Sequence, residues 1–248
     1  MPLRSRLLRH EKRREPADTA TVEPGQLLQA LRPVSTEFTL APELALIVRP
    51  GVIWWTGATV VLHEHRLDAL LAEAEAKVRI TPPAESVSVR TMYKKVGIDP
   101  TKTRPSNEAL LRRVRKGDTI PRINSAVDVI NWCSLEFQLP YGLYDASKIS
   151  GPVTMRRGAE GEKYAGIRKD EVNVGGRITV ADALGPFGNP TSDSARTMVT
   201  PAATELLVIV YAPVEIGTPQ LDRVVAITAD RLQEITGGSR MPLSSAGG

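Results

Sequence analysis

The sequence feature that most constrains the fold is a run of six apolar residues over positions 206–211 (LLVIVY). A run of this length and composition predicts a central β-strand that is buried on both faces. Further strands are predicted where β-branched and apolar residues gather, at residues 44–48, 52–62, 153–157 and 177–182. A turn at Pro50 and Gly51 is expected to separate the first two of these strands.

Apolar residues recur at helical spacing in four other segments. The predicted helices span residues 64–77, 105–116, 125–137 and 221–235. Ser106 and Gly117 suit the two ends of the second helix. Asn124 or Ser125 can cap the third helix, which stops before Pro140. Strands and helices in this arrangement predict an α+β fold, a mixed β-sheet with helices packed outside it.

The two ends of the chain differ in composition from its body. Residues 1–36 are charged, contain proline and lack periodicity, so we expect a basic, disordered arm or a mis-assigned start codon. Residues 237–248 are rich in Gly and Ser and predict a flexible tail. Residues 37–236 are predicted to form the folded domain, which the pair Pro82-Pro83 divides. Its expected parts are opening strands and a helix (37–83) and a core (84–236).

The formal net charge of +4 comes from the arm, because the first sixteen residues contain six basic and two acidic residues. The rest of the chain is formally neutral, so a basic field over the whole domain is excluded as a means of attracting nucleic acid. A local field is possible, since residues 94–122 contain nine basic and three acidic residues. The cations at the end of the helix over 105–116 either complement the helix dipole on a solvated face or contact phosphates.

The hydropathy and the cysteine content of the sequence indicate the cellular compartment. No apolar run approaches the roughly 18 residues that a membrane-spanning helix needs. The N-terminal arm lacks the apolar centre of a secretory signal. The single cysteine, Cys133, cannot form an internal disulfide and fits a reducing compartment. We therefore expect a cytoplasmic protein without a membrane partner.

The three histidines, His10, His63 and His65, limit the available chemistry. None follows Arg66, so the later part of the chain cannot build a Ser-His-Asp or Cys-His site by itself. The H-x-H pattern at His63 is weak support for a metal site, and we expect no metal. The sequence contains no glycine-rich motif for phosphates or dinucleotides, and we expect no cofactor. Cys133 lies beside the apolar side of its predicted helix, which predicts a packed thiol rather than a nucleophile.

A polar loop over residues 185–197 (GPFGNPTSDSART) contains many of the remaining reactive groups. It follows a predicted strand and precedes the apolar run. Its glycines allow backbone amides to approach a ligand, and its Ser, Asp, Arg and Thr side chains supply donors and acceptors. The segment is therefore either a binding loop or a hydrogen-bonded turn in which Asp193 and Arg196 form a structural pair.

Residues 120–162 contain the pattern R-x-N-x-x-V-D-V-x-N, followed by P-x-x-x-x-D. The matching residues are Arg122, Asn124, Val127, Asp128, Val129, Asn131, Pro140 and Asp145. This segment resembles the B3/B4 domain of the phenylalanyl-tRNA synthetase β chain, and a looser resemblance extends over residues 90–212. The resemblance implies the fold of that editing domain, which hydrolyses the ester of tyrosine wrongly attached to phenylalanine tRNA.

Without a synthetase catalytic domain, the chain is similar to the solo B3/B4 proteins. Two positions depart from the synthetase pattern. Gly142 stands in the place of a family histidine, and the acid nearest to the family's pocket glutamate is Asp193. Asn131 matches a pocket asparagine. For a solo protein, the resemblance implies either hydrolysis of mischarged tRNA in trans or tRNA binding without hydrolysis.

We expect the amino-acid pocket to lie between one helix and the polar loop. Asp193 is the expected catalytic residue, which orients a water or the ammonium group of the substrate. Arg196 is expected either to pair with Asp193 or to hold the terminal phosphate of the RNA. The expected substrate-binding residues are Asn131, Gly188, Asn189, Ser192, Arg196 and Thr197. The expected RNA-binding residues are Lys94, Lys95, Arg112, Arg113, Arg115, Lys116 and Arg122.

Three functions are compatible with the sequence. The first is a tRNA-linked hydrolase that removes an unwanted amino acid from tRNA in trans, with aminoacylated tRNA as its partner. The second is a non-catalytic module that binds tRNA or associates with an aminoacyl-tRNA synthetase. The third is a hydrolase of small esters or amino-acid derivatives on the same scaffold. The sequence does not identify the amino acid, the tRNA or the oligomeric state.

Overall fold

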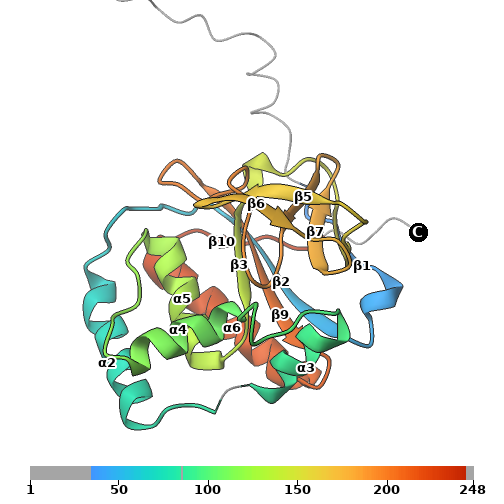
Figure 1. Ribbon diagram of the computed structural model, residues 1–248. Helices are drawn as coiled ribbons and strands as arrows, with labels where there is room; N and C mark the ends of the chain where they lie inside the picture. Colours follow the sequence, from blue (N-terminus) through green and yellow to red (C-terminus); the bar gives the residue numbers. More distant parts are fainter. Residues whose placement is uncertain (1–34, 85, 244–248) are drawn as a thin grey trace, which may run out of the picture. The chain divides into compact units, whose positions relative to one another are not determined.

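The computed structural model describes residues 35–84 and 86–243 of the 248-residue chain. The arm expected over residues 1–36 lies outside the described residues, except for its last two. Thr36 is buried, and its hydroxyl donates a hydrogen bond to the Pro242 carbonyl (3.0 Å). The described residues form two four-stranded sheets, a separate hairpin and five α-helices (Figure 1).

The first sheet contains the predicted central strand. Its strands lie in the order β10 (Ser239–Arg240), β2 (Val48–Thr56), β9 (Glu205–Pro213) and β3 (Tyr141–Asp145), and every neighbouring pair is antiparallel. The side chains of residues 206–212 in β9 are fully buried. The prediction of a buried central strand is therefore confirmed, because a strand covered on both faces needs apolar residues at every position.

The second sheet has the order β1 (Phe38–Leu40), β4 (Val153–Arg157), β7 (Ile178–Asp182) and β8 (Gly185–Gly188). β1 runs parallel to β4 and the other pairs are antiparallel, so this sheet is mixed. The predicted α+β class is confirmed. The prediction of a single sheet is wrong, since periodicity identifies strands but does not indicate which of them pair. β5 (Lys163–Gly166) and β6 (Lys169–Asn173) form the hairpin.

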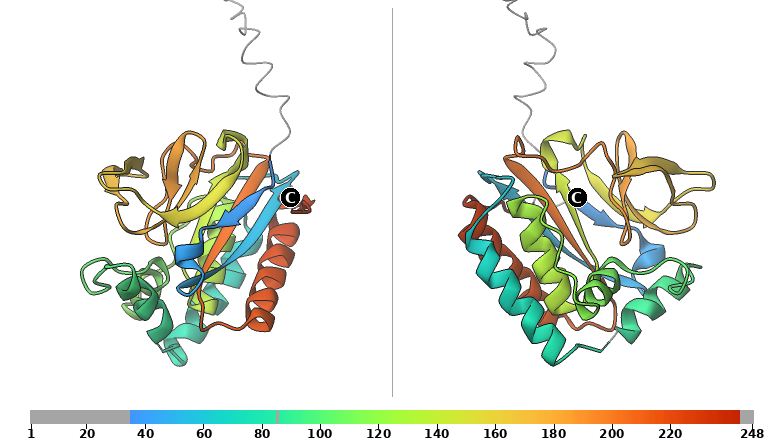
Figure 2. Two further views of the ribbon diagram at one scale, coloured as in Figure 1. Left: turned by 90° about the vertical axis from the view of Figure 1, so that its right-hand side faces the viewer. Right: turned by 60° about the vertical axis from the view of Figure 1, so that its left-hand side comes forward.

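Four helices form a layer on one face of the first sheet. They are α2 (Arg66–Ile80), α4 (Ser106–Arg115), α5 (Ser125–Phe137) and α6 (Thr218–Thr236). Figures 1 and 2 show the second sheet on the other side of β2 and β9. α5 contacts α2, α4, α6 and β3, which places it at the centre of this layer. A fifth helix, α3 (Val87–Lys95), contacts β9 and has no counterpart among the predicted elements.

α5 begins and ends where the sequence predicts. The Asn124 side chain caps it by accepting a hydrogen bond from the Val127 N–H (3.0 Å). Gln138, with a left-handed φ of 53°, ends the helix before Pro140. Cys133 is buried, as expected, and burial raises the pKa of its thiol. Local capping and apolar spacing therefore place this helix correctly.

The turn predicted at Pro50 and Gly51 is wrong, because β2 runs through both residues. Pro50 pairs with Tyr211 of β9, whereas β10 covers the other side of β2 only near Thr56. Pro50 therefore lies where β2 is an edge strand, and an edge tolerates a residue that lacks an N–H. Gly51 allows α6 to approach, since a Cβ there would lie 2.7 Å from the Val225 side chain.

Part of the segment expected to be a flexible tail belongs to the fold. Ser239–Arg240 forms β10 and pairs with Trp55 and Thr56, while residues 244–248 lie outside the described part of the chain. None of the described helices combines the length and the apolarity needed to cross a bilayer.

Candidate functional site

A cavity of about 490 Å³ lies among α5, β3, the turn between β5 and β6, and the loop after β8. Its wall consists of Ile123, Val127, Ile130, Asn131, Tyr141, Leu143, Ile167, Arg168, Asp193, Ala195, Met198 and Val199. The hydroxyl of Tyr141 is already hydrogen-bonded to Thr228 (3.1 Å). Asn131, Arg168 and Asp193 are the remaining polar side chains of this mostly apolar wall, a composition that is typical of small-molecule pockets.

One face of α5 forms part of the wall. Val127, Ile130 and Asn131 are three and four positions apart, so they project from the same side of the helix. Asn131 is half-buried, and its amide forms no hydrogen bond with any residue that the structure describes. An amide in this position offers both a donor and an acceptor to a ligand.

Asp193 contributes the acidic group of the cavity. Its Oδ1 is buried and has no hydrogen-bond partner among the described residues. Burial raises the pKa of the Asp193 carboxyl to about 7, although hydrogen bonding with the Tyr144 hydroxyl and the Leu143 backbone opposes this rise. At neutral pH this carboxyl can therefore accept and release a proton, as a general acid–base residue must.

Hydrogen bonds hold the loop that carries Asp193 in a defined conformation. The Asn189 Oδ1 accepts hydrogen bonds from the N–H groups of Thr191 and Ser192 (2.7 and 2.9 Å). The Asn189 Nδ2 donates to the Tyr164 hydroxyl (2.9 Å), which in turn donates to the Ser192 carbonyl (2.5 Å). The loop is thus a hydrogen-bonded turn that also presents an acid to a cavity.

Several expected substrate-binding residues support this loop and do not line the cavity: Gly188, Asn189, Ser192 and Thr197. Thr197 is fully buried, and its carbonyl accepts a hydrogen bond from the Asp145 N–H (2.9 Å). The structure does not place these four residues in the cavity wall, and their contact with a substrate stays a prediction. They are part of the structure that positions Asp193.

Gly142 and Gly188 both lie against the buried side chain of Tyr144. A Cβ at Gly142 would lie 2.1 Å from the Tyr144 hydroxyl oxygen, and a Cβ at Gly188 would also lie 2.1 Å from it. The Tyr144 hydroxyl is 2.8 Å from that of Tyr211, and both residues are fully buried. The phenol of Tyr144 therefore occupies the space that a larger residue at position 142 would need, which explains the glycine there.

Arg196 does not pair with Asp193. Its guanidinium forms a two-pronged ion pair with Asp182 (2.9 and 3.0 Å) and donates to the Lys148 carbonyl (2.9 Å). It also lies 5.6 Å from the centre of the Phe187 ring. The expected pair with Asp193 is wrong, because Asp182, at the end of β7, provides two carboxylate oxygens within reach. Arg196 is also absent from the cavity wall.

Arg122, one of the expected RNA-binding residues, is held by groups of the protein. Its Nε bonds the Asp128 carboxylate (2.7 Å), its Nη1 contacts Asp68, and its Nη2 donates to the Glu64 carbonyl (2.9 Å). Asp128 is fully buried and also accepts a hydrogen bond from the Ile123 N–H (2.8 Å). Arg122 thus holds the segment before α5 in place, and its expected contact with RNA stays a prediction.

The other six expected RNA-binding cations divide into two groups, and none of them lines the cavity. Three are engaged by the protein: Lys95 by the Glu215 carboxylate, Arg113 by the Thr119 carbonyl and Arg115 by the Pro83 carbonyl. Three are exposed and form no hydrogen bond or ion pair with the residues described: Lys94, Arg112 and Lys116. The second group is accessible to an anionic partner.

Arg168 lines the cavity but was not among the expected site residues. It is the second residue of the turn between β5 and β6 and has a φ of 58°. Its side chain is exposed and makes no hydrogen bond or ion pair with any described residue. Sequence reasoning missed it because β5 and β6 are short, polar strands without an apolar alternation.

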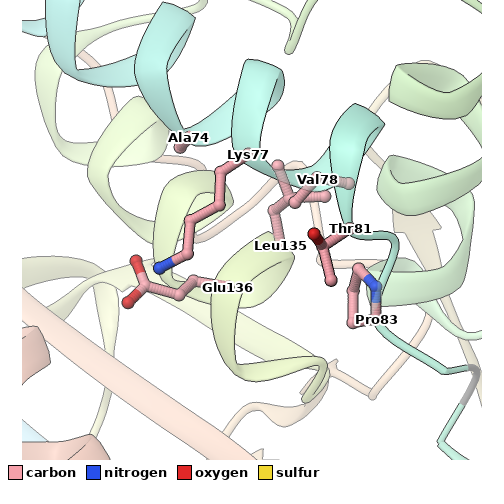
Figure 3. A pocket seen from close by; sticks show the side chains of 7 residues that line it. All are labelled: Ala74, Lys77, Val78, Thr81, Pro83, Leu135 and Glu136. Atoms are coloured by element: carbon pink, nitrogen blue, oxygen red, sulfur yellow. The ribbon is translucent and has the colours of Figure 1, made fainter.

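A second cavity, of about 140 Å³, lies between α2 and α5 (Figure 3). It is lined by Ala74, Lys77, Val78, Thr81, Pro83, Leu135 and Glu136. Figure 3 shows the Lys77 and Glu136 side chains extending toward one another. Glu136 is already ion-paired with Arg231 (2.6 Å), and the cavity contains none of the expected site residues. The cavity lined by Asn131 and Asp193 is therefore the candidate site.

His63, His65 and Asp68 place their ligand atoms within 4.8 Å of one another, on the exposed surface. Both imidazoles lie near the Asp68 Oδ2 (3.3 and 3.4 Å), and Arg122 contacts the other carboxylate oxygen. Arg122 and hydrogen bonding to the two imidazoles lower the pKa of Asp68. The Asp68 carboxylate is thus already paired within the protein, with the two imidazoles at one oxygen and the Arg122 guanidinium at the other.

The described part of the chain is thus an α+β domain with a ligand-sized, mostly apolar cavity beside an acid of raised pKa, an arrangement that is typical of small-molecule pockets. The family model described as the B3/4 domain matches residues 88–220, which is more than half of the chain. The chain belongs to the B3/4 domain family. The matched residues include α5, β3 and the loop that carries Asp193, and therefore most of the cavity wall.

Two curated relatives have the same name. The phenylalanine–tRNA ligase beta subunit of Streptomyces avermitilis is 31% identical over 114 residues, which are 45% of this chain and 13% of that protein. The beta subunit of Nocardia farcinica is 26% identical over 201 residues, which are 69% of this chain and 23% of that protein. The chain therefore spans less than a quarter of the length of these relatives.

Among solved structures, the chain is similar to an N-terminal fragment of the phenylalanyl-tRNA synthetase beta-subunit from Pyrococcus horikoshii. The TM-score is 0.47 and the sequence identity is 14%, over 82% of this chain and 50% of that chain.

Proposed function

We propose that this chain binds the aminoacylated end of a tRNA in the cavity of about 490 Å³ and hydrolyses the aminoacyl ester in trans. One observation carries the proposal: Asn131 and Asp193, which are 62 residues apart in the sequence, line the same cavity. Membership of the B3/4 family supports it, as does the match to two phenylalanine–tRNA ligase beta subunits. The partner is then a tRNA, aminoacylated with an amino acid that the chain removes.

In the proposed reaction, a water oxygen attacks the carbonyl carbon of the ester while the Asp193 carboxylate takes a proton from that water. The bond between the carbonyl carbon and the ribose oxygen then breaks, and the ribose oxygen receives the proton as a hydroxyl group. The products are the free amino acid and a tRNA with a free terminal hydroxyl. An aminoacyl ester is an activated bond, so a positioned water and one base are sufficient without a histidine.

Asn131 has a separate role in this proposal. Its amide N–H donates to the ester carbonyl oxygen, which gains negative charge as the water attacks. The aliphatic side chains of the wall hold the side chain of the amino acid. The exposed cations Lys94, Arg112 and Lys116 contact phosphates further along the RNA, since none of them lines the cavity.

The test is a deacylation assay with a panel of mischarged tRNAs, in which the free amino acid released over time is measured. We expect release above background for at least one amino acid. We expect Asn131→Ala to lower that rate at least about thirtyfold, because one donor to a developing oxyanion contributes about 2 kcal/mol or more. Gln233→Ala, which removes an exposed amide from α6, is the matched control and leaves the rate unchanged. Background release with every tRNA would refute the hydrolytic function.

Binding of tRNA without hydrolysis is a second candidate function. The geometry at Tyr144 favours it, because the phenol fills the space that the family histidine would use at position 142. In that case the protein binds tRNA in a salt-sensitive manner, and the double variant Arg112→Ala, Lys116→Ala weakens binding. Asn131→Ala then leaves tRNA binding unchanged, and no tRNA is deacylated.

A further inference from the structure

Arg168 adopts a backbone conformation that arginine rarely uses. Its φ of 58° lies in the left-handed region, where a Cβ collides with the neighbouring carbonyl and where glycine or asparagine is usual. Turns between two strands commonly place glycine at such a position. Non-glycine residues in this conformation gather at ligand sites, where the surrounding structure maintains them. The Arg168 side chain forms no hydrogen bond or ion pair with the described residues, so no such bond of its own holds it in this conformation.

The turn that carries Arg168 is attached to the loop that carries Asp193. The Ile167 N–H donates to the Asp193 carbonyl (3.1 Å), and the Ala195 N–H donates to the Ala165 carbonyl (2.9 Å). A bridge between Gly166 and Ser194 joins the same two segments. Any movement of the turn relative to Asp193 would break these bonds. The cation and the acid are therefore held at defined places on one cavity wall.

Arg168 and Asp193 are the charged groups of the cavity wall, and they do not form an ion pair with each other. The exposed guanidinium of Arg168 has no carboxylate of the described residues as its partner, so it is available to an anionic group of a ligand in this cavity. A guanidinium binds carboxylates and phosphates with two parallel hydrogen bonds. We infer that Arg168 binds an oxyanion of the ligand whose aminoacyl part occupies this cavity.

This inference rests on the proposed function for the aminoacyl part, and two sources could supply the oxyanion. In an aminoacyl-tRNA it is the phosphate on the 5′ side of the terminal adenosine. In a free amino acid it is the carboxylate itself. The chemistry at Arg168 is the same in both cases, so the two sources are separated by the choice of probe.

The experiment measures dissociation constants by calorimetry with the full chain. The first probes are leucine, phenylalanine and tyrosine, each joined through an amide to 3′-amino-3′-deoxyadenosine, with and without a 5′-phosphate. The second probes are the three free amino acids and their amides. The proteins are the wild type, Arg168→Ala, Arg168→Lys and the control Arg223→Ala, which removes an exposed arginine of α6.

With a phosphate as the source, Arg168→Ala weakens binding of the phosphorylated analogue at least about tenfold and leaves the unphosphorylated one unchanged. With a carboxylate as the source, Arg168→Ala weakens binding of the free amino acid but not of its amide. Arg168→Lys binds with intermediate affinity, because an ammonium group cannot form the paired bonds. Arg223→Ala binds every probe as the wild type does.

The inference is overturned if Arg168→Ala binds every probe with wild-type affinity, or if the wild type binds none of them. If the wild type binds free amino acids but no adenosine analogue, the deacylase proposal fails, while the loss of amino-acid affinity in Arg168→Ala still supports the inference.

The variant Arg168→Gly adds a separate measurement, of thermal stability. It relieves the left-handed backbone, so the melting temperature rises by about 2–4 °C while the oxyanion contact is lost. A fall in melting temperature would indicate a structural role instead.

Discussion

Replacement of Asp193 by asparagine is expected to stabilise the protein at alkaline pH. The Asp193 carboxyl has a buried oxygen without a hydrogen-bond partner among the described residues, and burial raises its pKa to about 7. Ionisation of this group in the folded protein therefore opposes folding. Asparagine has nearly the same shape and carries no charge, so Asp193→Asn removes this unfavourable ionisation while the loop retains its other hydrogen bonds.

The size and the sign of the effect follow from proton linkage. The pKa of an aspartate is about 3.9 in an unfolded chain, and each unit of difference is about 1.4 kcal/mol of unfolding free energy. Between about pH 4 and pH 7 the folded protein retains a proton that the unfolded chain has lost, so its stability falls as the pH rises. Above pH 7 the loss is complete and amounts to at most about 4 kcal/mol.

The assay is urea unfolding of the wild type and of Asp193→Asn at pH 5, 6, 7 and 8, where pH is the only variable. We expect the variant to gain stability relative to the wild type at each step up to about pH 7 and to remain ahead at pH 8. Asp222→Asn, which changes an exposed acid on α6, is the control and shows no such trend. A variant that is less stable than the wild type at pH 8, or a difference that does not vary with pH, would refute the buried, proton-binding state of Asp193.

Three further predictions concern residues outside the cavity wall. Gly142→Ala places a Cβ against the neighbouring buried phenol and lowers stability by about 1–3 kcal/mol, measured by urea unfolding. Arg122→Ala leaves the fully buried Asp128 carboxylate without its cation and lowers stability by about 3 kcal/mol in the same measurement. The double variant Arg112→Ala, Lys116→Ala retains wild-type stability, because both side chains are exposed, but binds tRNA more weakly and with a smaller salt dependence.

A specific result would contradict each of these three predictions. A Gly142→Ala protein as stable as the wild type would mean that the phenol can move aside. An Arg122→Ala protein with full stability and impaired tRNA affinity would contradict the structural role of Arg122 and support the RNA-binding role expected for it. Wild-type tRNA affinity in the double variant at every salt concentration would exclude α4 from the RNA interface.

Local signals in the sequence were sufficient for several elements. The Asn124 cap and the proline at position 140 predicted the two ends of α5, and the run over 206–211 identified the central strand. The division of the strands between two sheets was not predictable, since it depends on pairing between segments far apart in the chain. The turn predicted at Pro50 was wrong for the same reason, since strand pairing decides whether a strand tolerates proline. β2 accepts Pro50 because the neighbouring strand β10 is too short to pair with this part of β2.

Only part of the candidate site could be predicted from the sequence. Asn131 and Asp193 were expected in one pocket, and both line the cavity. The ion pairs of Arg196 with Asp182 and of Arg122 with Asp128 were not predictable. The two aspartates reach the arginines only in the folded protein, where β7 and α5 hold them. Arg168 carried no local signal, since its place on the cavity wall results from the packing of a short hairpin against the loop of Asp193.

The most direct test of the proposed hydrolysis is the pH dependence of single-turnover deacylation, measured on the mischarged tRNA that the panel identifies. If Asp193 is the base, the wild-type rate rises about tenfold per pH unit below pH 7 and levels off above it, following the ionisation of the carboxyl. Asp193→Asn then releases amino acid at the background rate at every pH. Equal rates for the two proteins, or a wild-type rate without an inflection near pH 7, would contradict this role.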